Sequence, residues 1–274
     1  MAKVSNEAKQ RYLEKIKEYK SAIEEIRKKE KQDLETIAGE SNGVEYKKLS
    51  LADEVLNLVS YYLLMNSLSL TVLGVKNEAF LNDARKALYK GIIYLEEVVS
   101  AYIDAPFSDY EEKLSKIEKL TVDKRYFLLR KLGFAIHSVI DGFGDNSKWK
   151  WSFVELEGRF ATVSKNFLDL RNLLAGLDPR VEGYESRLSH LVLVKRLMQE
   201  AADKYRQKYE LSTSRIDDFK TAIDYLAGLR RLHIVMGEAD DSEASKKKIE
   251  IRRTKMEADS KRSEQKARQK PRKK

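Results

Sequence analysis

The chain has 274 residues, of which 42% are hydrophobic and 35% charged, and it contains no Cys. The lack of Cys excludes disulfides, thiolate metal sites and cysteine nucleophiles. Only three Pro and twelve Gly interrupt a sequence rich in Lys, Glu, Leu, Ala and Arg. Because these are strong helix formers, the composition predicts an all-α protein.

The positive charge is concentrated at the C-terminal end. Residues 246–274 contain fourteen Lys/Arg and four Asp/Glu, a net charge of +10, whereas the whole chain carries +9. An acidic run, Glu238–Glu243, precedes them. We therefore expect three parts: an N-terminal amphipathic helix (1–43), a helical bundle body (44–237), and an acidic linker plus basic tail (238–274), either disordered or a solvated helix.

The first expected helix covers residues 6–38. Its apolar residues recur at alternating intervals of four and three, a spacing that aligns them on one face. They are Tyr12, Ile16, Tyr19, Ile23 and Ile26. Because this repeat is too short for an independent coiled coil, the helix must pack on the body or on a partner. Its apolar face is therefore a candidate partner contact.

The segment 55–75 carries no charge and approaches the length of a membrane span. Polar residues such as Asn57 and Asn66 interrupt it, and a helix buried within the protein explains the pattern as well. Both alternatives stay open. Ser50 and Asp53 have the spacing of a capping box at its start, and Gly74 is a suitable C-terminal cap.

Capping residues predict the next helices. Asn77 should begin a helix that stops before Pro106, and Ser108 with Glu111 should open a short one. Thr121 should cap a further helix, with Tyr126, Leu129, Ile136 and Ile140 turned inward.

The second half has the clearest helical repeat. Apolar residues predict one helix over 149–177 and another over 178–209, separated by a tight turn in which Pro179 takes the first helical position. This arrangement predicts a long antiparallel helical hairpin. Ser214 and Asp217 should cap a last helix ending at Gly237. The expected fold is a bundle of about eight helices.

No catalytic or metal-binding pattern is recognisable. The residues three before His137, His190 and His233 are Phe134, Arg187 and Arg230, so the helical Glu-x-x-His metal motif is absent. The loop 141–147 lacks the ligands that a calcium loop needs at its third and twelfth positions. No Gly-rich phosphate-binding motif occurs. We expect a non-catalytic protein without cofactor or metal.

The tail is the strongest functional feature. Its density of cations predicts attachment to a polyanion: nucleic acid, an anionic membrane surface or an acidic protein. The candidate residues are Lys246, Lys247, Lys248, Arg252, Arg253, Lys255, Lys261, Arg262, Lys266, Arg268, Lys270, Arg272, Lys273 and Lys274. Trp151, flanked by lysines, is a further candidate partner contact.

The sequence therefore favours a non-catalytic scaffold that docks a protein partner, with the tail adding electrostatic attachment. The alternative is an RNA- or DNA-binding protein that uses the tail, with the body as a dimerisation platform. Self-association into a homo-oligomer is compatible with both. The charged N-terminus lacks an apolar stretch, which predicts a cytoplasmic location.

Overall fold

The computed structural model describes residues 5–39, 42–144 and 147–269, with side chains described as far as residue 262. Within these residues the chain is helical and contains no strand. The helices are α1 (Asn6–Gly39), α2 (Val44–Leu73), α3 (Glu78–Val98), α4 (Glu111–Ser115), α5 (Val122–Phe143), α6 (Lys150–Asn166), α7 (Tyr184–Lys208), α8 (Ile216–Val235) and α9 (Ala239–Gln269). The expected all-α fold of about eight long helices is confirmed.

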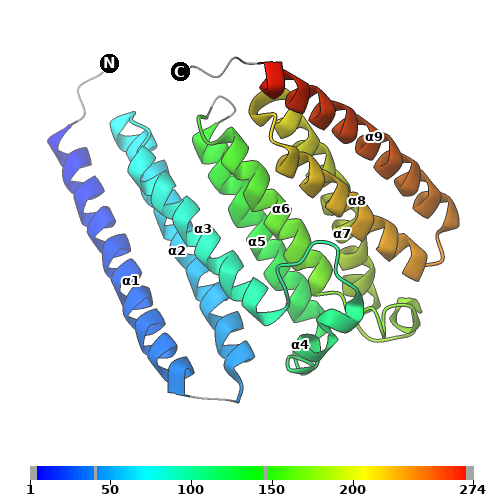
Figure 1. Cartoon of the computed structure of the whole chain (residues 1–274). Helices are drawn as coiled ribbons and strands as arrows, with labels where there is room; N and C mark the ends of the chain where they lie inside the picture. The colour runs from blue at the N-terminus through cyan, green and yellow to red at the C-terminus, as the bar shows by residue number, and fades with distance from the viewer. Residues whose placement is uncertain (1–4, 40–41, 145–146, 270–274) are drawn as a thin grey trace.

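The helices stack in order across the molecule, from α1 at one edge to α9 at the other (Figure 1). The central helices pack most extensively as α2 with α3, α6 with α7, and α7 with α8, and α5 contacts α2, α3, α6 and α7. Helices α2, α5 and α7 contact one another in succession and form one row. In the second row α3 contacts α6, and Thr162 of α6 hydrogen-bonds to Tyr225 of α8. The core lies between the two rows.

Helix α2 is the uncharged segment, and it lies against α1, α3 and α5. Its length and apolar composition meet the criteria for a membrane-spanning helix, although the core helix of a soluble protein can meet the same criteria. Its buried polar groups have partners inside the protein, since Asn66 Oδ1 accepts from the backbone N–H of Asn77 at 2.8 Å. Contact with these three helices buries 44% of its most apolar window, while Leu64 and Leu70 stay exposed.

The helix ends confirm some of the expected caps and correct others. Gly74, in the left-handed conformation, ends α2, while Asn77 and Thr121 cap α3 and α5 with their side chains. Helix α2 begins earlier than expected, after Gly43 rather than at Ser50. The predictions of helix-capping boxes at Ser108 and Ser214 are wrong. The first lies in a 3₁₀ turn (Phe107–Asp109), and the second follows a π-helical turn (Tyr209–Thr213).

Helices α6 and α7 pack together, but their connection is longer than predicted. Helix α6 ends at Asn166, and residues 167–183 form irregular turns with a 3₁₀ segment, Ala175–Leu177. The side chain of Asn166 donates to the backbone oxygens of Ser100 and Tyr102, which fixes the end of α6 to the loop after α3. The predicted repeat does not continue past this point: Phe167 is buried, but Leu174 is 55% exposed. Leu168 and Leu173, which lie outside the repeat, are buried instead.

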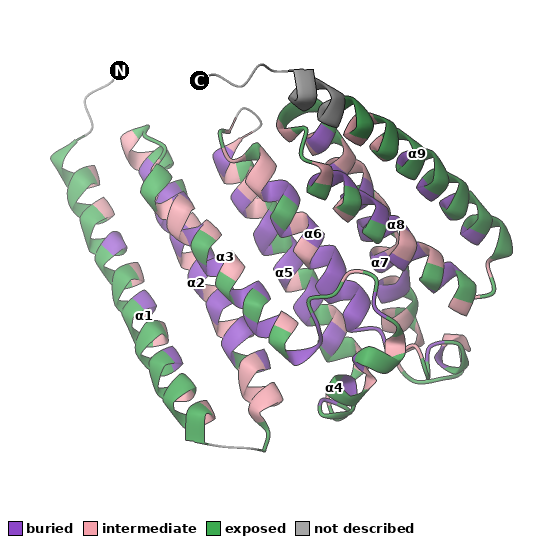
Figure 2. Ribbon diagram, in the orientation of Figure 1, coloured by how far each residue is buried: buried purple, intermediate pink, exposed green. Residues whose placement is uncertain are grey.

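The beginning of the expected tail is part of the folded structure. Helix α9 packs against α8, and its buried positions recur along the side that faces α8 (Figure 2). Ile249 and Arg252 are buried there. The segment 239–262 is thus a packed helix, which differs from the expected linker and solvated tail.

Candidate functional site

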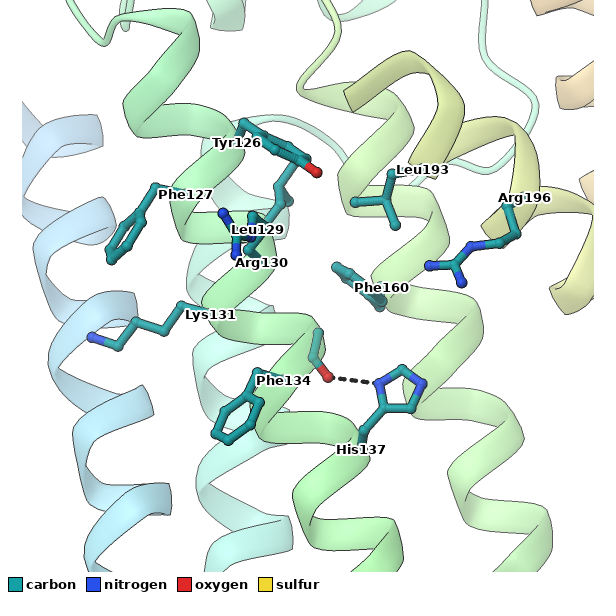
Figure 3. A pocket seen from close by; sticks show the side chains of 11 residues that line it. Tyr126, Phe127, Leu129, Arg130, Lys131, Phe134, His137, Phe160, Leu193 and Arg196 are labelled. Carbon is teal, nitrogen blue, oxygen red and sulfur yellow. Dashed lines mark hydrogen bonds between the residues drawn. The ribbon is translucent and has the colours of Figure 1, made fainter. Parts of the chain in front are cut away.

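A groove of about 530 Å³ opens on the row formed by α2, α5 and α7. Helix α5 forms most of its wall, α6 contributes Phe160, and α7 contributes Leu193 and Arg196. Figure 3 shows Phe127, Lys131 and Phe134 on the side of α5 next to α2, and His137 on the side towards α7.

Two large aromatic side chains of α5 are exposed to solvent at this groove. Phe127 is 65% exposed and Phe134 is 75% exposed. Residues seven apart lie on the same face of a helix, so the two rings form one apolar strip. Isolated exposed apolar residues are ordinary, but paired rings beside a groove are typical of an interaction surface.

The floor of the groove depends on a close approach between α5 and α6. A Cβ atom at Gly133 would lie 2.9 Å from Cζ of Phe160, too close for an undisturbed contact. Glycine at this position therefore lets the Phe160 ring reach the groove beneath α5. Because Phe160 and Leu129 are buried, they give the groove a fixed apolar base.

The groove is weakly cationic. Its charged lining residues are Arg130, Lys131 and Arg196, and no carboxylate lines it. Lys131 forms an ion pair with Asp53 of α2 at 2.6 Å, and Arg196 lies 4.0 Å from Glu200. Arg130 lies over the Tyr126 ring, 5.9 Å from its centre, and forms no ion pair with a described carboxylate. Only one of the three cations is thus left without an acidic neighbour.

His137 also lines the groove, and its proton position follows from its hydrogen bond. Its Nδ1 donates to the backbone oxygen of Gly133 at 2.7 Å, as Figure 3 shows. The neutral ring therefore offers Nε2 as an acceptor. No described acid orients the ring as a general base would require.

The apolar face of α1 is covered within the molecule. Ile16 and Ile23 are buried, while Tyr12, Tyr19 and Ile26 pack against the core. The hydroxyl of Tyr12 hydrogen-bonds to Ser69 of α2 at 2.9 Å. These five residues thus lie together on one face of α1. Because α2 already covers that face, a partner cannot bind to it in this structure.

Trp151 lies away from the groove. It is half-buried and lines a separate hollow with Ile140, Phe153 and Lys204. Lys150 Nζ lies 5.4 Å from the centre of its ring.

The candidate tail residues do not form one free cationic surface. Arg252 is buried, Lys255 pairs with Glu210, Lys246 pairs with Glu243, and Lys248 donates to Gln199. Four described cations of the tail are exposed and form neither an ion pair nor a side-chain hydrogen bond with a described residue: Lys247, Arg253, Lys261 and Arg262. The side chains of Lys266 and Arg268 lie outside the described set, as do Lys270, Arg272, Lys273 and Lys274 entirely.

One group of side chains has the spacing of metal ligands. Donor atoms of His233, Glu238 and Asp241 lie within 4.8 Å of one another. However, Glu238 already forms ion pairs with Lys195 and with His233, the latter at 2.6 Å. A metal ion would have to displace Lys195, so we assign no metal to this group.

Sequence comparison places the chain in a family. Residues 8–260 match the TP0443 family. The chain belongs to the TP0443 family. Neither the curated proteins nor the solved structures give a significant match. Membership of the TP0443 family does not by itself indicate an activity. The groove is the feature from which we infer a function for this family member.

Proposed function

We propose that this TP0443 family member is a non-catalytic interaction protein that docks an amphipathic, acidic segment of a protein partner. The exposed strip of Phe127 and Phe134 beside the groove supports this proposal most directly. Apolar side chains of the partner segment would cover the two rings, and a carboxylate would pair with Arg130. Such a contact removes aromatic surface from water, which dominates the energy of many interfaces.

The modest charge of the groove favours a protein over a nucleic acid at this surface. A single-stranded nucleic acid needs stacking rings together with a continuous track of cations for its phosphates. Here the rings are present, but Lys131 and Arg196 already have acidic neighbours. One unpaired guanidinium matches one carboxylate better than a chain of phosphates.

The exposed cations of α9 support an additional electrostatic attachment. Lys247, Arg253, Lys261 and Arg262 have no described ion-pair partner, so they remain free to meet a polyanion. This contact would fall steeply with salt because it works through counterion release. Docking through Phe127 and Phe134 would depend much less on salt, which separates the two contributions in an experiment.

Site-specific photo-crosslinking in cells tests the docking surface. A photoreactive phenylalanine analogue replaces Phe134 in one full-length variant and Leu211 in the control. Leu211 is equally exposed, at 73%, but lies in the Tyr209–Thr213 turn. We expect a discrete protein adduct from position 134 that position 211 does not give, and Arg130→Glu should weaken it roughly tenfold or more.

Adducts of identical size and yield from both positions would contradict the proposal, as would their complete absence. Binding of labelled poly(U), duplex DNA and anionic vesicles is measured in parallel across a salt series. If poly(U) binding depends on Phe127 and Phe134, the surface is a nucleic-acid site instead of a protein-docking site.

A further inference from the structure

A second, smaller cavity lies apart from the docking groove and shares no lining residue with it. It has a volume of about 160 Å³ and lies between the start of α5, the segment after α6 and the start of α7. Arg125, Arg187 and His190 line it. Two guanidinium groups therefore face one small space.

Arg125 is buried and has no ion-pair partner in direct contact among the described residues. It is 8% exposed, and its guanidinium donates to the backbone oxygens of Leu120 at 2.9 Å and Ile117 at 3.1 Å. It forms no ion pair with any described carboxylate. A buried cation normally has an anionic partner, because removing a charge from water is costly. Burial accordingly lowers the pKa of Arg125.

Arg187 brings a second cation to the same cavity. Its Nη1 donates to the backbone oxygen of Gly176 at 2.8 Å, and it also forms no ion pair with a described residue. A Cβ atom at Gly176 would lie 2.5 Å from Cζ of Arg187, so glycine makes room for the guanidinium. The two arginines repel one another, which makes the missing negative charge more pronounced.

The nearest acids compensate that charge only through space: the carboxylate of Asp169 raises the pKa of Arg125, although the effect of burial outweighs it. Asp169 lines the cavity, but its oxygens accept from the backbone N–H of Asn172 at 3.4 Å and from the Asn172 amide at 2.8 Å. Glu118 also lines the cavity and is exposed. Neither acid forms an ion pair with Arg125 or Arg187. The beginning of α5 lies at the same place and adds the positive end of its dipole.

We propose that this cavity binds a small oxyanion, a phosphate or carboxylate group held between Arg125 and Arg187. Guanidinium groups bind such oxygens through paired, charge-assisted hydrogen bonds. The ring of His190 adds a preference for a ligand that carries a hydroxyl group. Its Nε2 donates to the backbone oxygen of Ser164 at 2.8 Å, so Nδ1 is left to accept a hydrogen bond from a hydroxyl of the ligand.

Calorimetric titration of the full-length protein with inorganic phosphate, and separately with succinate, tests the proposal. Arg187→Gln is the principal variant because Arg187 is only half-buried and the fold does not depend on it as on Arg125. Arg180→Gln is the control, since Arg180 lies nearby, is exposed, pairs with Asp178 and does not line the cavity. We expect saturable binding of at least one anion, weakened roughly tenfold in Arg187→Gln and unchanged in Arg180→Gln.

The tighter of the two anions identifies the ligand as a phosphate or a carboxylate compound. Absence of binding up to tens of millimolar of both anions would overturn the proposal. Equal weakening by both substitutions would also overturn it, because that result indicates a general charge effect. Circular dichroism of both variants verifies that they are folded.

Discussion

Arg252 lies inside the molecule although it belongs to the most basic part of the sequence. It donates to the backbone oxygen of Ala202 at 2.9 Å and pairs with Asp203 at 2.6 Å, which ties α9 to α7. Arg252→Met removes these bonds and the partly buried ion pair with Asp203, so we expect a loss of about 2–4 kcal/mol in the free energy of unfolding. Urea denaturation measures it. Arg253→Met is the control because Arg253 is exposed, and equal losses would contradict this role of Arg252.

His190 makes stability depend on pH. Burial lowers its pKa from 6.5 to about 4, the charge of Arg125 acts in the same direction, and the bond to Ser164 opposes both. The unfolded chain then binds a proton at a higher pH than the folded chain does. The stabilisation is therefore complete above about pH 6.5 and is lost as the pH falls towards about 4.

We expect the free energy of unfolding to fall by about 2 kcal/mol between pH 7 and pH 5 through His190 alone. Urea denaturation at both pH values, in phosphate-free buffer, measures the difference. His190→Gln should flatten this pH dependence, whereas His137→Gln should keep it, since His137 is not buried. An unchanged slope in His190→Gln would show that other groups cause the effect.

Gly158 lets helix α6 pack closely against Tyr205 of α7 and Tyr225 of α8. A Cβ atom there would lie 2.7 Å from both the Tyr205 ring and the Tyr225 hydroxyl. We expect Gly158→Ala to cost about 1–3 kcal/mol, because overpacking outweighs the better helix propensity of Ala. Thermal unfolding measures the cost. Gly39→Ala is the matched control, since nothing lies near its Cβ position, and it should cause no loss.

The sequence predicted the helices better than their ends. Asn77 and Thr121 cap helices as expected because their side chains act on backbone groups only two or three residues away. Asn166 ends α6 through bonds to Ser100 and Tyr102, which are distant in sequence. Such tertiary bonds leave no local pattern. The apolar repeat after Asn166 predicted burial correctly at Phe167 but not at Leu174, which is 55% exposed, because the helical spacing does not hold on irregular backbone.

The groove was only partly visible in the sequence. Phe127 and Phe134 fall outside the inward face predicted for their helix, and this mismatch was the available signal. Their exposure depends on how α2 and α7 flank α5, which a single sequence does not reveal.

The prediction of a solvated or disordered tail was wrong for a related reason. The many charged residues of the tail made it look fully solvated, although one of its helical faces, which includes Ile249 and Arg252, is buried.

The whole molecule includes α9 as a structural helix. A chain ending at residue 238 lacks the contacts of α9 with α8 and exposes the surface that Ile249 covers. We expect this truncation to lose at least as much stability as Arg252→Met, whereas a chain ending at residue 262 should retain it. Urea denaturation of the three lengths tests this. Equal stability of the 238-residue and full-length chains would show that α9 is dispensable.

The stacking of helices in chain order has a consequence for folding. Most long helices pack mainly on the helix next to them in sequence, from α1 on α2 to α9 on α8, whereas α5 packs chiefly on α2 and α3. Low contact order reduces the loop-closure entropy of the folding nucleus, so the chain should fold rapidly. The two end helices each rest on few neighbours, and their amide protons should exchange with solvent before those of the central pairs.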